Sequence, residues 1–131
     1  MSKLQSIGIG VSDILGAQAF YQPVVRPLGM TVMMSIEAEP SRSNPRRVGF
    51  GSGGKPFVRL HHVSAPSQGA HIALIATSRE AVDAFYVAGI AAGGQANWAP
   101  VIRPHYHSNY YEAQVLAPDG VNLEAVCHVA F

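Results

Sequence analysis

The sequence predicts an α+β fold of two tandem βαβββ modules, residues 1–66 and 67–131, which together make one functional domain. Two observations lead to this prediction: the chain repeats itself halfway along its length, and each half has one helical pattern among four strand patterns. One module alone is too small to bury a stable core. We therefore expect the modules to form a curved mixed sheet around a central cleft, with the helices on the outer face.

The internal repeat has a constant offset. The tripeptide Ala-Phe-Tyr occupies residues 19–21 and again 84–86, so the second copy lies 65 residues after the first. Three further pairs have the same offset: Ile7 and Ile72, Ile9 and Leu74, and Gly29 and Gly94. A gap-free series of matches indicates two copies of one supersecondary unit.

The first half predicts a strand, a helix and three more strands. Residues 7–11 alternate between apolar and small or polar side chains, as in a half-buried strand. The Ser-Asp pair at 12–13 offers a helix N-cap, and apolar positions over 14–25 share one helical face. Pro27 and Gly29 end this helix. The remaining strands are expected over 30–36, 48–52 and 57–63.

The second half predicts the same order of elements. Residues 71–76 form a strand pattern, and Thr77 with Glu80 matches a capping box for a helix that runs from Ser78 to near Gly93. A weak strand at 95–98 and strands at 110–116 and 121–128 follow, with a Pro-Asp-Gly turn at 118–120.

Composition narrows the classes of function. Net charge is +1, and charged residues make up 13% of the chain, about half the usual share. No basic run could follow a phosphate backbone, so no nucleic acid is expected, and no apolar stretch approaches the roughly 20 residues of a membrane span. Cys127 is the only cysteine, which fits a reducing cytoplasm. A surface so poor in charge favours a homodimer.

Three segments resemble those of a known superfamily. They are IGVSD at 9–13, GAHIA at 69–73 and APDGVNLE at 117–124. In these motifs and in its module order, the chain resembles the vicinal oxygen chelate superfamily of glyoxalases, bleomycin-resistance proteins and extradiol dioxygenases. The resemblance covers essentially the whole chain. It implies paired βαβββ modules with a metal or a small-molecule ligand in the cleft between them.

The resemblance also implies four metal-ligand positions, one on the first and one on the last strand of each module. They correspond to Ser6, Arg59, His71 and Glu124. His71 and Glu124 suit a divalent ion such as Zn, Ni, Mn or Fe, and they are the candidate metal-binding and catalytic residues. Arg59 cannot ligate a metal because its guanidinium stays protonated, and Ser6 is a poor neutral ligand.

Two interpretations of this half-complete set remain open. In the first, no cofactor is bound, and Arg59 pairs with Glu124 across the cleft in place of the metal. In the second, a partial metal site uses His71, Glu124 and a third residue, one of His61, His105 and His107.

The loop over residues 103–111 is rich in His and Tyr and is expected near the mouth of the cleft. Such side chains bind anionic or aromatic ligands or transfer protons. The alternative is a structural loop whose Tyr rings pack on the sheet. Gly8 and Gly10 would leave room for a ligand. The candidate ligand-binding residues are Arg59, Ser6, His105, His107, Tyr110, Tyr111 and Trp98.

These residues favour a protein that binds a small anionic or aromatic molecule in the inter-module cleft and has a degraded metal site. The alternative is a metal-dependent lyase, isomerase or dioxygenase, in which the metal would stabilise an oxyanion. A third hypothesis is a metal-free enzyme with Arg59 as the oxyanion clamp and Glu124 or a loop His as acid or base.

Overall fold

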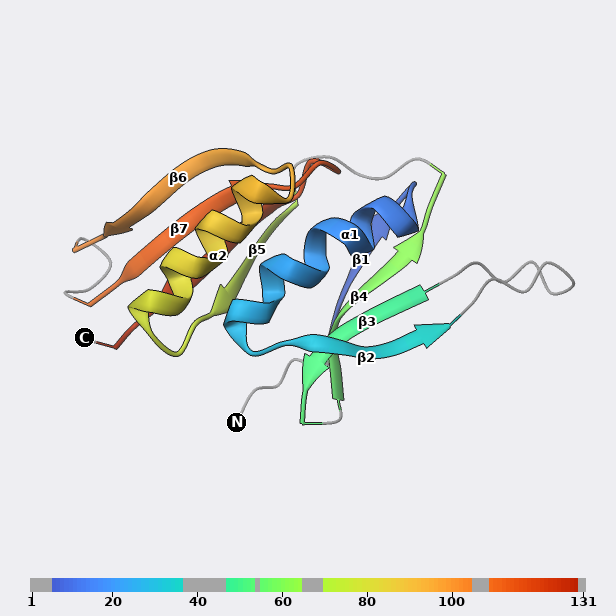
Figure 1. Ribbon diagram of the computed structural model, residues 1–131, viewed down its shortest axis with the longest axis horizontal. Helices are drawn as coiled ribbons and strands as arrows, with labels where there is room; N and C mark the ends of the chain where they lie inside the picture. Colours follow the sequence, from blue (N-terminus) through green and yellow to red (C-terminus); the bar gives the residue numbers. More distant parts are fainter. Residues whose placement is uncertain (1–5, 37–46, 54, 65–69, 105–108, 130–131) are drawn as a thin grey trace, which may run out of the picture.

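The computed structural model describes residues 6–36, 47–53, 55–64, 70–104 and 109–129. It shows two βαβββ modules, as predicted (Figure 1). The first module contains β1 (Ile7–Val11), α1 (Ile14–Val25), the 3₁₀ turn η1 (Arg26–Leu28), β2 (Thr31–Ile36), β3 (Arg47–Ser52) and β4 (Lys55–His62). The second contains β5 (His71–Ile75), α2 (Arg79–Ala91), β6 (Gln95–Ile102), β7 (Tyr111–Leu116) and β8 (Asn122–Cys127). The predicted boundary at 66/67 lies outside the described residues.

Each module folds into its own four-stranded mixed sheet, in the order β1-β4-β3-β2 and β5-β8-β7-β6. The first and last strands of each module pair in parallel, and the other pairs are antiparallel. Helices α1 and α2 lie side by side, and each packs on one face of its own sheet (Figure 1). The opposite face of each sheet is not covered by a helix and is called the open face below.

The 65-residue repeat extends to the register of the strands. Gly8 is opposite Arg59 in the β1–β4 pair, and Ala73 is opposite Glu124 in the β5–β8 pair. Each residue of the second pair lies 65 positions after its counterpart in the first. Arg59 and Glu124 therefore occupy equivalent positions of the two modules.

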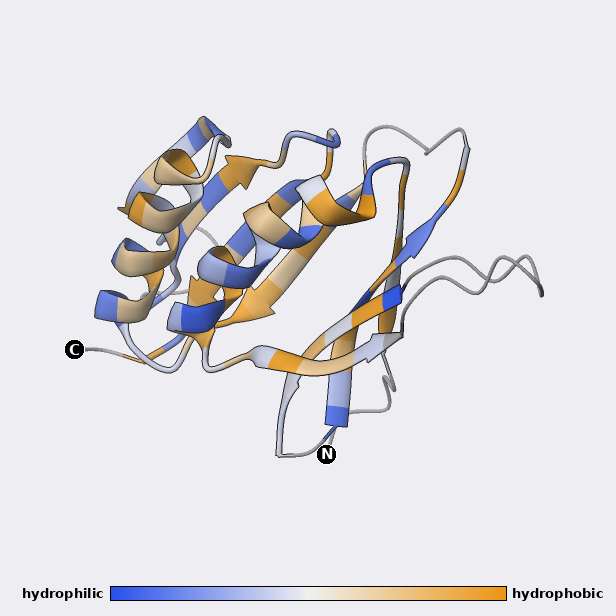
Figure 2. Cartoon of the chain, turned by 45° about the vertical axis from the view of Figure 1, so that its right-hand side comes forward, coloured by the Kyte–Doolittle hydropathy of each residue, from blue (hydrophilic) through white to orange (hydrophobic). Residues whose placement is uncertain are grey.

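The core lies between the helices and the sheets because apolar residues alternate along the strands. This alternation is visible in the hydropathy colours of Figure 2. Phe20 and Phe85, the equivalent aromatic residues of the two helices, are both buried. Cys127 is also fully buried and is therefore a thiol of the core.

Side chains cap both helices at their N-termini. The Asp13 carboxylate accepts a hydrogen bond from the backbone N–H of Gly16 at 3.0 Å, as the sequence predicts for α1. The predicted capping box of Thr77 is wrong. Ser78 caps α2 instead, and its Oγ accepts from the N–H of Ala81 at 3.1 Å, because the helix begins one residue later than predicted.

Strand β6 is longer than predicted and continues through Pro100 to Ile102. A proline lacks the N–H that an interior strand needs, which is why the sequence suggests a loop there. β6 is an edge strand, and its pairing with β7 is irregular between Trp98 and Val101. An edge strand with such an irregularity tolerates proline.

The two modules are joined by packing and by a hydrogen bond. Helices α1 and α2 are in contact, and an added Cβ on Gly94 would lie 3.0 Å from Phe20 of the first module. The hydroxyl of Tyr21 on α1 donates to the Asp119 carboxylate in the β7–β8 turn at 3.1 Å. Among the described residues, no helix is long and apolar enough to cross a membrane.

Candidate functional site: the open faces of the two sheets

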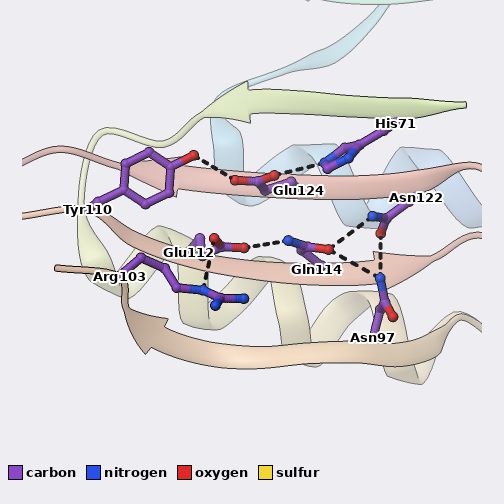
Figure 3. Close-up of polar contacts among 8 residues, drawn as sticks. All are labelled: His71, Asn97, Arg103, Tyr110, Glu112, Gln114, Asn122 and Glu124. Carbon is purple, nitrogen blue, oxygen red and sulfur yellow. Dashed lines mark hydrogen bonds and ion pairs between the residues drawn. The ribbon is translucent and has the colours of Figure 1, made fainter. Parts of the chain in front are cut away.

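The open face of the second sheet has a continuous set of polar side chains (Figure 3). Alternation along the strands puts every second residue on this face: Glu112 and Gln114 from β7, and Asn122 and Glu124 from β8. Tyr110, just before β7, and His71, on β5, point to the same face (Figure 3). Three neighbouring strands thus bring together residues from widely separated parts of the chain.

Glu124 is a buried carboxylate, only 5% exposed, with a partner on each oxygen. His71 Nε2 lies 2.8 Å from Oε1, and the Tyr110 hydroxyl donates to Oε2 at 2.9 Å. The His71 side chain is itself 50% exposed, so its ring is open to solvent or to a ligand. A buried carboxylate requires such partners, because desolvating an unpaired charge is costly.

Glu112 is a second buried carboxylate on this face, 2% exposed. Arg103 Nε lies 3.2 Å from Oε2, and Gln114 donates to Oε1 at 2.6 Å. The Gln114 carbonyl oxygen accepts from the amides of Asn97 at 3.2 Å and Asn122 at 3.0 Å. The chain of contacts therefore runs from the Arg103–Glu112 pair through Gln114 to the amides of Asn97 and Asn122, and Asn122 lies opposite His71 in the β5–β8 pair (Figure 3).

Trp98 contacts Arg103, the arginine of this network. The guanidinium carbon of Arg103 lies 3.8 Å from the centre of the Trp98 ring, a cation–π contact. Trp98 remains 45% exposed. It therefore presents an apolar surface at the edge of the polar face.

Five residues of this network were not among the candidate site residues predicted from the sequence: Arg103, Glu112, Gln114, Asn97 and Asn122. A signal was nevertheless present, because Glu112 and Gln114 are spaced by two residues, as are Asn122 and Glu124. Polar residues at period two on a strand whose other side is apolar mark its solvent or ligand face. The partners of each residue depend on strand register and are visible only in the structure.

Tyr111 is a predicted ligand-binding residue that points away from this face. Its hydroxyl donates to Asp83 of α2 at 2.6 Å, and Arg79 lies over its ring. Burial and the contact with Asp83 raise the pKa of Tyr111 to about 12, although the charge of Arg79 opposes the shift. Tyr110 and Tyr111 are adjacent in a strand-like segment, so only one of them can reach the open face.

The open face of the first sheet has positively charged side chains. A hollow of about 390 Å³ on this face is lined by Ser6, Gly8, Met34, Arg47, Arg59, Leu60 and His61. Two of these side chains are guanidinium cations, and none of the lining residues is acidic. In the part of the chain that the structure describes, the buried Nε of Arg47 has no hydrogen-bond partner. Buried N–H groups normally have an acceptor, so this one favours an anion in the hollow.

The ion pair between Arg59 and Glu124 is not formed within the chain. Arg59 is exposed on the first sheet, whereas Glu124 contacts His71 and Tyr110 on the second. Ser6 and His61 line the Arg59 hollow. His105 and His107, the other predicted site residues, lie outside the described residues.

The residues at the four implied positions do not fit a divalent metal. His71 and Glu124 have metal-ligand chemistry and contact each other, whereas Arg59 is a cation that cannot ligate. Among the residues that the structure describes, no group of three or more His, Cys, Asp or Glu side chains is placed to hold a metal ion. No chemical step is therefore assigned to a metal here.

No family model and no curated protein sequence matches the chain. Solved structures do match it over nearly its whole length. A glyoxalase/bleomycin resistance protein from Albidiferax ferrireducens aligns with a TM-score of 0.77 and 23% identity, covering 96% of this chain and 99% of that one. A glyoxalase/bleomycin resistance protein/dioxygenase family enzyme from Burkholderia phytofirmans aligns with a TM-score of 0.69 and 24% identity, covering 98% and 100%.

A glyoxalase I variant from Zea mays aligns with a TM-score of 0.69 and 18% identity, and this chain spans 46% of its length. The class of protein is thus one of paired βαβββ modules with polar open faces. The chain has the vicinal oxygen chelate fold, that of the glyoxalase, bleomycin-resistance and dioxygenase superfamily, which confirms the predicted fold.

Proposed function

We propose that this protein binds a small anionic molecule in the hollow lined by Arg47 and Arg59, and that the metal site typical of the fold is degraded. One observation supports this most directly: two arginines and His61 line one hollow, and none of its described lining residues is acidic. The volume of about 390 Å³ is within the range of small-molecule sites.

Strand register explains how the two arginines cooperate. Arg47 of β3 lies opposite His61 of β4, and Gly49 lies opposite Arg59. Residues two apart on a strand share a face, so Arg47, Arg59 and His61 point to the same side. Gly8 and Gly49, the neighbours of Arg59 across both strand pairs, have no side chains that would cover it.

The metal-dependent alternative has less support in the geometry. Two of its four expected positions have metal-ligand chemistry, and those two residues already contact each other. A metal titration distinguishes the metal-dependent alternative from the metal-free binding protein.

Binding of benzoate, an aromatic carboxylate, tests the proposal. Arg59→Gln should weaken benzoate binding about tenfold or more, because a charge-assisted hydrogen bond contributes about 1.5–3 kcal/mol. Arg59→Lys should keep part of the affinity through its charge. Chemical-shift titration by NMR measures each Kd and shows whether the amides of Gly8 and Gly49 respond.

The matched control is Arg26→Gln, which removes the same charge from an exposed residue on η1. It should leave benzoate binding unchanged. Equal Kd values for Arg59→Gln, Arg26→Gln and the unaltered protein would contradict the proposed function.

A further inference from the structure

A second hollow adjoins the arginine hollow on the first sheet. Its volume is about 310 Å³, and it shares Gly8 and His61 with the arginine hollow. The lining of this second hollow consists of Gly8, Ile9, Gly10, His61, Val63, Ala70, Ile72 and Val121. The two hollows are therefore adjacent, with His61 at the border between them, and together they are called the trough below.

The second hollow lies where the two modules meet. β1 is the edge strand of the first sheet and β5 the edge strand of the second. Ile9 comes from β1 and Ile72 from β5, while Ala70 and Val121 precede β5 and β8. Residues of both modules therefore line this hollow.

The chemistry of the trough changes along its length. The arginine hollow has two fixed cations, Arg47 and Arg59. Among the described residues that line the second hollow, His61 is ionisable and the others are glycine or aliphatic. An anionic head group matches one end, and an apolar tail matches the other.

Two glycines of β1 let side chains of the trough pack closely against the strand. A Cβ on Gly10 would lie 2.9 Å from Val63, closer than real contacts allow. A Cβ on Gly8 would touch His61 at 3.4 Å. Larger residues at these positions would displace Val63 or His61, so the two glycines have a role in the shape of the trough.

We propose that the trough binds a carboxylate with a short apolar tail, with the head group at Arg47 and Arg59 and the tail in the inter-module hollow. This inference rests on the proposed anion-binding function and adds the class of ligand. Burying each further methylene should tighten binding about fourfold until the hollow is full.

The test is a series of straight-chain carboxylates: acetate, butyrate, hexanoate and octanoate. NMR titration of the full-length chain gives each Kd. We expect the affinity to rise with chain length. Acetate should shift the signals of Gly8, whereas hexanoate should also shift those of Ala70 and Ile72.

Ala70→Gln places a polar, uncharged side chain at the rim of the apolar hollow. Ala70 is exposed and precedes β5, and its backbone oxygen accepts a hydrogen bond from the N–H of Asn122 at 2.8 Å. The variant should lose at least tenfold of the affinity for octanoate and bind acetate as before. The control, Ala19→Gln on the exposed face of α1, should behave like the unaltered protein.

The outcomes separate the two proposals. If acetate binding depends on Arg59 but affinity does not rise with chain length, the tail site is overturned and the anion site stands. An unchanged octanoate affinity in Ala70→Gln overturns the tail site in the same way. If no carboxylate binding depends on Arg59, both proposals fail.

Discussion

Glu124 and Glu112 show how individual residues make the polar face of the second sheet possible. Both carboxylates are at most 5% exposed, and each has a separate set of partners. Glu124 uses a histidine and a tyrosine, whereas Glu112 uses an arginine and a glutamine. Because both oxygens of each are occupied, neither carboxylate is left with an uncompensated buried charge.

A metal titration tests the role of Glu124. We expect no stoichiometric binding of Zn²⁺, Ni²⁺, Mn²⁺ or Fe²⁺ that depends on this residue, because a stable site needs three or four protein ligands. Isothermal titration on protein without a His-tag measures it, with elemental mass spectrometry for bound metal. Glu80→Gln removes an exposed carboxylate on α2 as the control. Near-stoichiometric metal that is lost only in Glu124→Gln would show a metal-dependent protein.

The sequence could identify His71, Glu124 and Tyr110 but not the network around Glu112. His71 and Glu124 stand out because the repeat and the motifs mark their positions. The partners of Glu112 are Gln114 on β7 and Arg103 in the segment after β6, and the position of Arg103 depends on the irregular β6–β7 register. Sequence patterns do not encode such irregularities.

At the scale of elements, the β7–β8 turn does more than reverse the chain. Gly120 has a φ of 93°, and its N–H donates to Ala117 O at 2.9 Å, which confirms the predicted Pro-Asp-Gly turn. Asp119 in this turn accepts from the N–H of Val121 and from the hydroxyl of Tyr21 on α1. The turn therefore ties the second sheet to the first helix.

This contact predicts a pH dependence of stability. Burial, and then the charge and hydrogen bond of Asp119, raise the pKa of Tyr21 above its usual value of about 10. The unfolded chain loses this proton at lower pH than the folded chain. The contribution of Tyr21 to stability is thus complete below about pH 10 and is lost as pH rises above it.

Urea unfolding of the unaltered protein and Tyr21→Phe, at pH 8 and at pH 10.5, measures this effect. At pH 8 the variant should be about 1 kcal/mol less stable, since it lacks one hydrogen bond. At pH 10.5 the difference should shrink, because phenylalanine has no proton to lose. Other ionising groups affect both proteins alike. A difference that stays constant between the two pH values would mean that the pKa of Tyr21 is not raised.

At the scale of the whole molecule, exposed apolar side chains remain on the surface. Ile75 on β5 is 73% exposed, and Leu15 and Val87 on the helices are also largely exposed. Together with the low share of charged residues, these side chains favour a partner chain. We expect a homodimer, since most soluble oligomers are symmetric dimers.

Light scattering after size-exclusion chromatography should give twice the mass of one chain. Ile75→Thr on the sheet and Val87→Thr on α2 then locate the interface, because the substitution that lies in it should increase the monomer fraction. A monomer at all concentrations would contradict the predicted homodimer.

The sequence alone determined the two-module repeat, the faces of most strands and the two capped helices. These features depend on side-chain periodicity and on a constant offset, which are properties of neighbouring positions along the chain. Only the tertiary structure decided that Glu124 pairs with His71 and Tyr110 and not with Arg59, and that a second hollow lined by both modules adjoins the arginine hollow. These features depend on distances between separate strands and between modules, which periodicity along one strand does not specify.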